Sequence, residues 1–306
     1  MERPSIRQLE CLVAVAEYRS FRKAATSLGM SQPALSAQVQ AAERLLGLQV
    51  FERDRRSVLV TPAGEDIVGR ARAALDSIDL VSDTARRRGE PLVGPLRVGV
   101  IPTVAPYWLP ALLPETRKRF PKLELILRED QTATLLAQLG AGQLDVAIVA
   151  IPVPGDLTTA PIAHENFLLA APRGSELMKK RGKIGEADLD HETVLLLEDG
   201  HCLRDQALAV CKRGGAIESM EMRATSLPTL IQMVAGGLGI TLIPESAATA
   251  LVPSRGPVET AAFSKPVPGR TIGLAWRTSS ARLREFRLLA EVMQQQAEAF
   301  LAKLRR

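Results

Sequence analysis

Two cysteines that lie nine residues apart are the side chains whose types and spacing could carry chemistry. Cys202 follows Gly200 and His201, and Cys211 lies further along the same segment. The thiolate is the reactive form of cysteine, and the start of a helix favours it through the helix dipole and the free backbone N–H groups. A strand, a glycine turn and a helix are expected here, so Cys202 would lie at the helix start with the positive charge of Arg204 nearby.

A helix that contained both cysteines would keep them apart. Nine steps of 1.5 Å separate the two Cα atoms by about 13.5 Å along the axis, and nine rotations of 100° place them on opposite faces. A disulfide needs Cα atoms within roughly 7 Å. Joining Cys202 to Cys211 would therefore require the helix to unwind, as in a redox switch. Cys11 falls at the edge of an apolar helix face and is expected to be inert packing.

The segment around Cys202 belongs to a region in which strands and helices alternate after Gly94 and Pro95. Expected strands cover 96–101, 123–127, 145–149, 167–171, 194–197, 240–243 and 271–276, and expected helices cover 104–120, 132–141, 201–212, 227–235 and 281–304. This alternation indicates parallel α/β structure. Ligands of such sheets bind beyond the strand C-termini, often between two lobes, which places Thr103, Thr132 and the loop 199–205 at the expected site.

The first 61 residues predict a different fold, an all-α winged helix-turn-helix. Apolar periodicity predicts helices that end near Arg19, begin after Ser20 and begin again after Ser31, with Gly29 in the turn. Helices alone would fit many bundles, but a hairpin wing with a charged tip follows over 50–60. We expect two groups of DNA contacts: Ser31, Gln32, Pro33 and Ser36 in the major groove, and Arg53, Arg55 and Arg56 on phosphates.

A long helix over 62–90 is expected to link the two parts. Its apolar positions recur in steps of four and three, at Ile67, Ala71, Ala74, Ile78, Val81 and Ala85. Such a heptad stripe needs a partner helix, and a second copy of the chain is the simplest one. We therefore expect a homodimer that binds a pseudo-palindromic site in double-stranded DNA. The expected domains are 1–61 for DNA binding, 62–90 for dimerisation and 91–306 for regulation.

Composition and motifs exclude several other classes of protein. Lys and Arg exceed Asp and Glu by 39 to 34, a mild net charge of +5 that permits DNA binding, and three Cys with three His are too few for a disulfide scaffold or a typical zinc site. The glycine-rich run 236–239 follows a helix and precedes a strand, the reverse of a dinucleotide loop. We therefore expect no metal, no cofactor and no enzyme, and a cytoplasmic protein without a membrane span.

The sequence resembles the LysR-type transcriptional regulators over nearly its whole length. The motifs are Ser31-Gln32-Pro33-Ala34-Leu35-Ser36 and Leu45-Leu46-Gly47 in the first part, and the segments 142–148 and 239–244 in the second. The resemblance implies a regulatory part of two Rossmann-like α/β lobes, as in periplasmic binding proteins. The segments 101–104, 135–139, 197–207, 223–227 and 270–274 more narrowly resemble the hydrogen-peroxide-sensing members of this family.

This narrower resemblance implies that Cys202 reacts with peroxide and that Cys211 then forms a reversible disulfide with it. It also implies a peroxide pocket made by Thr103, Thr132, His201, Asp205 and Arg270. A homotetramer that activates antioxidant genes, with RNA polymerase as a partner, is the expected assembly. Two alternatives stay open: a LysR-type regulator that senses a small metabolite between its lobes, and a thiol peroxidase with an added helical domain.

Overall fold

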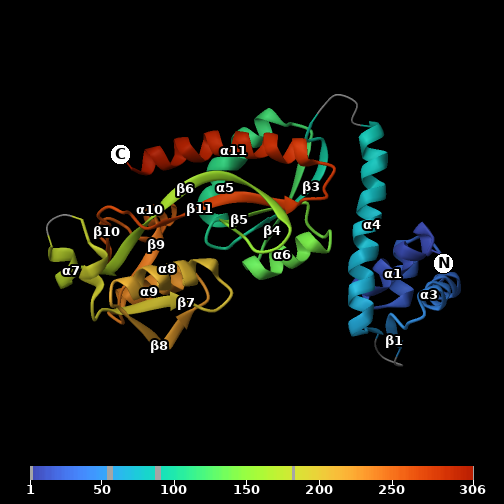
Figure 1. Cartoon of the computed structure of the whole chain (residues 1–306), viewed down its shortest axis with the longest axis horizontal. Helices are drawn as coiled ribbons and strands as arrows, with labels where there is room; N and C mark the ends of the chain where they lie inside the picture. Colours follow the sequence, from blue (N-terminus) through green and yellow to red (C-terminus); the bar gives the residue numbers. More distant parts are fainter. Residues whose placement is uncertain (1–2, 54–57, 87–90, 181–182, 306) are drawn as a thin grey trace. The chain divides into compact units, whose positions relative to one another are not determined.

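One long strand, β6 (Leu157–Pro172), organises the larger part of the chain (Figure 1). The computed structural model describes residues 3–53, 58–86, 91–180 and 183–305. The chain divides into an N-terminal unit built on residues 1–90 and a larger unit built on residues 91–139 and 144–306. No helix in the described ranges has the length and apolar character needed to cross a bilayer.

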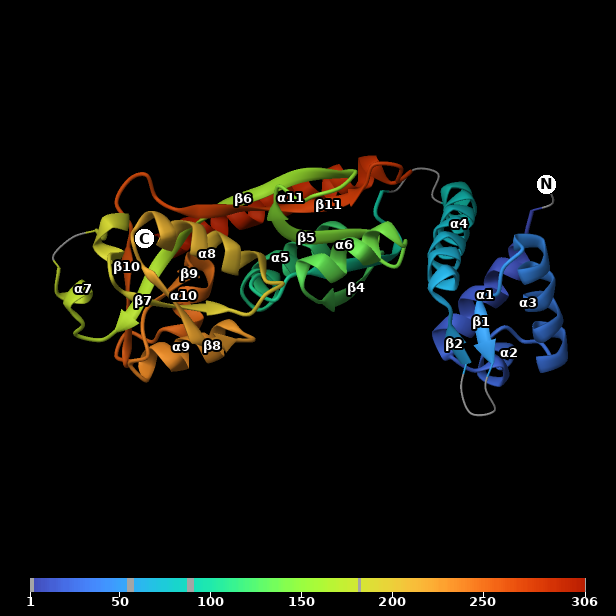
Figure 2. The same cartoon turned by 60° about the horizontal axis from the view of Figure 1, so that its bottom comes forward.

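The N-terminal unit is a helical bundle with a short hairpin. Its helices are α1 (Ile6–Tyr18), α2 (Phe21–Ser27), α3 (Gln32–Leu46) and α4 (Pro62–Arg86), and its hairpin joins β1 (Phe51–Arg53) to β2 (Val58–Val60) (Figure 2). Ser5, Ser20 and Ser31 cap the first three helices by accepting a backbone N–H. Gly29, at φ +62°, makes the turn before α3. The predicted helix starts at Ser20 and Ser31 are therefore confirmed.

The two halves of α4 have different surroundings. Val68 and Ala71 are buried and Ile67 packs on the core of the N-terminal unit, where α1 contacts α4. Val81 is 72% exposed although it is apolar. The first half of the predicted apolar stripe thus packs against the core of the N-terminal unit, and Val81 in the second half faces solvent. Ala85, its last position, lies outside the residues whose side chains the structure describes.

The first lobe of the larger unit is built on three parallel strands, as the sequence predicts. They are β3 (Gly94–Val100), β4 (Leu123–Glu129) and β5 (Val146–Ile151), connected by α5 (Ala105–Arg119) and α6 (Thr132–Gly140). The sheet continues antiparallel through β11 (Gly269–Arg277) to β6, in the order β4-β3-β5-β11-β6. Helix α11 (Leu283–Leu304) and α6 lie on opposite sides of this sheet (Figure 1).

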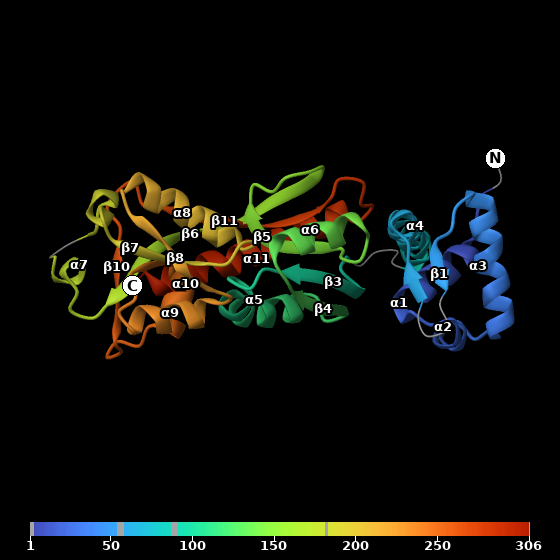
Figure 3. The same cartoon turned by 90° about the horizontal axis from the view of Figure 1, so that it is seen from below.

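The second lobe forms around the far half of β6. That half pairs with β9 (Thr241–Pro244) and β10 (Val258–Ala262), while β7 (Thr193–Leu197) pairs in parallel with β8 (Ile217–Ala224). Helices α8 (Cys202–Arg213) and α9 (Leu227–Ala235) lie on opposite sides of β7 (Figure 2, Figure 3). Gly236 ends α9, so the glycine-rich run is a helix stop as predicted.

Several segments of the larger unit have no counterpart in the sequence-based prediction. They are β8, β10, the first half of β6, α7 (Glu176–Lys179), a 3-10 helix (Glu186–Leu189) and α10 (Glu245–Leu251). Charged or small residues interrupt the apolar pattern in most of these segments. They are held by pairing with a neighbouring strand or by packing, which local periodicity does not report.

Candidate functional site

Cys202 is the first residue of α8, directly after a tight turn. Strand β7 ends at Leu197, and Gly200 turns the chain at φ +98°, a backbone conformation that favours glycine. His201 is the N-cap residue, and its side chain does not cap the helix. The half-buried Cys202 thiol is free and lies at the N-terminal, positive end of the helix dipole.

Cys211 lies in the last turn of the same helix and is fully buried. Burial, with a smaller contribution from the negative charge of Glu186, raises the pKa of the Cys211 thiol to about 12, against a still smaller opposing effect of Arg213. The unbroken helix keeps the two cysteines about 13.5 Å apart along its axis. The reduced structure therefore holds one accessible thiol and one protonated, enclosed thiol that cannot meet without a change in α8.

A cluster of ion pairs fixes the start of α8. The guanidinium of Arg204 lies 3.2 Å from Asp199, 3.3 Å from Asp205 and 2.9 Å from Glu218 on β8. Arg223 adds a second pair with Asp199 at 2.6 Å. Arg204 is mostly buried, whereas the Asp205 side chain is 81% exposed and lies on the outer side of the helix. Asp205 is therefore part of this cluster and is not brought to Thr103 or Arg270.

The turn before Cys202 rests against the start of α6. His201 is buried, with Nε2 3.9 Å from a carboxylate oxygen of Glu198, and Gln131 donates to that oxygen at 3.4 Å. A side chain at Gly200 would collide with Gln131. Next to it, the Oγ1 atom of Thr132 is buried without a hydrogen-bond partner among the described residues. An orphaned buried hydroxyl is a place where a small polar molecule could bind.

Thr103 and Thr132 leave the sheet at the same edge. Each follows the last residue of its strand by three positions, and those last residues, Val100 of β3 and Glu129 of β4, are paired in parallel register. Thr103 is buried and accepts a hydrogen bond from Arg270 at 2.7 Å on Oγ1, and a second on its carbonyl at 3.0 Å. The first lobe thus offers two threonine hydroxyls and a guanidinium.

The residues that the sequence predicts to contact the major groove lie at the N-cap and in the first turns of α3. Ser31 accepts from the backbone N–H of Ala34 at 3.4 Å as the N-cap, Gln32 and Pro33 are exposed in the first turn, and Ser36 is half-buried. Arg53 ends β1. Its side chain, together with Arg55 and Arg56, lies outside the described residues.

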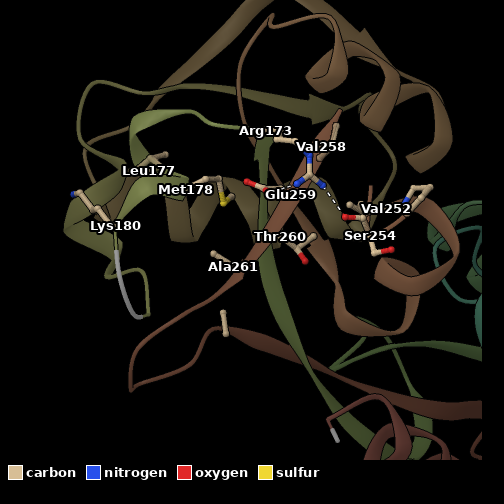
Figure 4. Close-up of a pocket in the computed structure, with 12 residues that line it drawn as sticks. Arg173, Leu177, Met178, Lys180, Val252, Ser254, Val258, Glu259, Thr260 and Ala261 are labelled. Carbon is tan, nitrogen blue, oxygen red and sulfur yellow. Dashed lines mark hydrogen bonds and ion pairs between the residues drawn. The ribbon is translucent and has the colours of Figure 1, made fainter. Parts of the chain in front are cut away.

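Two open pockets of about 520 Å³ each lie away from Cys202. The first, between α7 and β10, is lined by Arg173, Met178, Lys180 and Glu259, and its arginine is already bound by Glu259 (Figure 4). The second lies near the end of α11. No group of three or more acidic, His or Cys side chains in the described segments is placed to hold a metal ion.

A winged helix-turn-helix unit followed by a two-lobed α/β unit defines a DNA-binding regulator with a ligand- or redox-sensing part. Residues 6–65 match the bacterial regulatory helix-turn-helix protein family, lysR family, and residues 89–298 match the LysR substrate binding domain. The chain belongs to the LysR family of bacterial transcriptional regulators.

Several similar proteins of this family are named hydrogen peroxide-inducible genes activator, and others are named OxyR. The chain is 44% identical over 304 residues to the DNA-binding transcriptional dual regulator OxyR of Escherichia coli K12, covering 98% of both chains. A cysteine-to-aspartate variant of full-length OxyR from Pseudomonas aeruginosa has a TM-score of 0.80 at 34% identity, covering 95% of this chain and 98% of that one. A peroxide-bound cysteine-to-serine mutant of Corynebacterium glutamicum OxyR has a TM-score of 0.67 at 38% identity, covering 99% and 97%.

Sequence reasoning missed three residues that support Arg270. They are Glu165 on β6, Trp108 on α5 and Ser246 on α10, which are far apart in the chain and meet only in the fold. A single acidic residue in an unpredicted strand gives no local signal of burial. The paired strands β6 and β11 would have been the signal, because Glu165 lies directly opposite Arg270.

Proposed function

We propose that this protein senses hydrogen peroxide through Cys202 and passes the signal to DNA through a reversible disulfide with Cys211. The observation that carries the proposal is the pair of thiols on one helix, one at its accessible start and one buried near its end. The relatives named hydrogen peroxide-inducible genes activator support the peroxide-sensing part of this proposal.

The proposed chemistry has two steps. The Cys202 thiolate attacks one peroxide oxygen, the O–O bond breaks, and a sulfenic acid forms while the departing hydroxide takes up a proton as water. The Cys211 sulfur then attacks the Cys202 sulfur, the S–O bond breaks, and the disulfide forms with release of a second water. Two electrons pass from the thiols to one peroxide, so each switching event consumes one peroxide molecule and is not catalytic turnover.

The proposed peroxide pocket combines Thr103, Thr132, His201 and Arg270. The two threonine hydroxyls lie at one sheet edge, and the turn that carries His201 packs against the start of α6 beside Thr132. Hydroxyl groups can hold the peroxide oxygens, and the guanidinium supplies positive charge toward the developing hydroxide. Asp205 belongs to the ion pairs that hold the reduced helix, since its side chain is exposed beside Arg204.

We propose that the signal changes the arrangement of the DNA-binding units of a symmetric assembly on DNA. The exposed Val81 on α4 fits a dimer contact between two copies of this helix, and a homotetramer would place several reading heads on pseudo-palindromic sites. Unwinding α8 would change the surface of the second lobe, which can alter subunit contacts and the spacing of those heads. Activation of antioxidant genes through RNA polymerase would follow.

Three cysteine variants test the proposal by peroxide titration, mass spectrometry and DNA footprinting. With Cys202→Ser, peroxide should not change the DNA footprint, because the nucleophile is lost. Cys211→Ser should still form a sulfenic acid that persists or is oxidised further. Cys11→Ser, a buried thiol against Met30, should behave as wild type.

The same assays separate the alternatives. A normal peroxide response of Cys202→Ser, or a peroxide-treated wild type without a Cys202–Cys211 linkage, would refute the redox proposal and favour a metabolite-sensing regulator. Consumption of many peroxide molecules per chain, with a thiol as the reductant, would favour a thiol peroxidase.

A further inference from the structure

Glu165 is a fully buried acidic residue that the proposed chemistry does not yet use. It lies on β6 directly opposite Arg270 on β11, so the two side chains form a cross-strand pair. The Arg270 guanidinium reaches the same carboxylate oxygen of Glu165 with Nε at 2.8 Å and with a terminal nitrogen at 2.7 Å. Both side chains have no exposed surface.

Two more donors converge on the other carboxylate oxygen. The indole Nε1 of Trp108 donates to it at 3.3 Å, and the hydroxyl of Ser246 donates to it at 2.5 Å. Trp108 lies on α5 of the first lobe and Ser246 on α10 of the second. The carboxylate of Glu165 is thus fixed from both lobes, and it fixes Arg270 in turn.

Two further N–H groups of Arg270 point to Thr103. One terminal nitrogen donates to Oγ1 at 2.7 Å, and the other donates to the carbonyl oxygen at 3.0 Å. Because Oγ1 accepts from Arg270, the hydroxyl hydrogen of Thr103 must point elsewhere. The hydrogen bonds of the described residues include none in which this hydroxyl donates, so it is available as a donor to a bound molecule.

Holding the strands together is a weak explanation for this arrangement. Two charges lose their hydration on burial, and a buried ion pair contributes little net stability. Arg270 instead donates in two directions, to the carboxylate of Glu165 on one side and to Thr103, a residue of the proposed pocket, on the other. A fixed geometry of this kind is typical of groups that orient a reacting molecule.

We propose that Glu165 is a positioning residue of the peroxide pocket, which holds Arg270 so that the Thr103 hydroxyl donates to the peroxide. This inference rests on the proposed function. Replacing Glu165 should therefore slow the reaction of Cys202 with peroxide more than it slows the reaction of the same thiol with a general alkylating reagent.

The test compares two probes of Cys202 in the reduced full-length protein. Hydrogen peroxide and iodoacetamide are added in separate experiments, and loss of the thiol is followed by quenched labelling and mass spectrometry. Glu165→Gln removes the charge and replaces one acceptor oxygen by a donor. The peroxide rate constant should fall about ten- to hundredfold, and the iodoacetamide rate should change by about twofold or less.

Matched variants separate positioning from general damage. Glu165→Asp keeps the charge but withdraws the carboxylate by one methylene, so it should fold and lie between wild type and Glu165→Gln. Glu259→Gln removes the partner of Arg173 in a different pocket of the same unit, one that Cys202 does not line, and should change neither rate. In a Thr103→Val background, Glu165→Gln should add little further loss, because both changes remove the same donor.

The outcomes distinguish this inference from the proposed function. If Cys202 of the wild type fails to react with peroxide, the proposed function is wrong. If the wild type reacts but Glu165→Gln and Glu165→Asp match it, only the role of Glu165 is wrong. Equal slowing of both probes would show general damage to the fold and would also overturn the positioning role; should Glu165→Gln fail to fold, Glu165→Asp decides.

Discussion

The buried thiol of Cys211 should be almost unreactive while α8 is intact. Its pKa is raised from 9.0 to about 12 by burial, so at pH 8 the thiolate fraction is about 1,000-fold lower than that of an ordinary cysteine. Burial of the sulfur also blocks the approach of a reagent, which lowers the reactivity further. We therefore expect alkylation at pH 8 to be at least about 1,000-fold slower than in the unfolded chain.

The assay uses a chain in which Cys211 is the single thiol, with Cys11 and Cys202 replaced by serine. Iodoacetamide labelling is followed in the native protein and in guanidinium, where Cys211 has an ordinary pKa. A chain with Cys202 as the single thiol is the matched control and should react much faster, because that residue is half-buried at the helix start. Native labelling of Cys211 within about tenfold of the unfolded rate would refute the reasoning.

The pH dependence gives a second check with a definite sign. The folded state raises the pKa of the Cys211 thiol, so the neutral form is favoured in the fold. This contribution to the free energy of unfolding is complete below about pH 9 and is lost as pH rises toward about 12. Cys211→Ala, which has no group to ionise there, should lose less stability over that range in denaturant titrations.

Three further predictions concern DNA binding, assembly and the turn before Cys202. Arg55→Ala with Arg56→Ala should weaken binding to all DNA sequences and flatten its salt dependence by about one to two in log–log slope; an unchanged slope would remove the wing from the interface. Ile78→Glu with Val81→Glu should cost several kcal/mol, about 3 or more, of dimer association in sedimentation, and an intact dimer would contradict the α4 contact. Gly200→Ala should lower the free energy of unfolding of the reduced protein by about 1–2 kcal/mol in denaturant titrations, because an L side chain resists φ +98°; an unchanged midpoint would argue against strain at this turn.

The parts of the fold with strong local signals could be predicted from the sequence. Serine caps, the glycine turn at Gly29 and the apolar strands β3, β4 and β5 follow from residue type and spacing, and the structure has them within a few residues. The helix start at Cys202 was predicted in the same way, from a strand, a glycine and an amphipathic segment.

The parts set by distant contacts could not be predicted. The first half of β6 mixes polar and apolar residues, and it is a strand because β11 pairs with it along nine positions. Glu165 is buried only because four donors from three other elements meet its carboxylate. Asp205 shows the reverse case. The resemblance of its segment predicts a pocket residue, but its position on α8 directs the carboxylate toward solvent and Arg204.

In the proposed mechanism, these contacts make α8 the element that separates the sensing step from the switching step. Cys202 can meet peroxide in the reduced fold, whereas Cys211 is protonated, buried and about 13.5 Å away along the helix. By that proposal, a sulfenic acid at Cys202 waits until α8 opens, and opening at the start of the helix would break the ion pairs of Arg204 with Asp199 and Glu218. The proposed pocket would then control how fast Cys202 reacts with peroxide, and the stability of α8 would control how fast the sulfenic acid is converted to a disulfide. In this scheme, different residues set the rate of the peroxide reaction and the rate of disulfide formation. The peroxide threshold and the speed of the response could then change independently, which a single exposed cysteine would not allow.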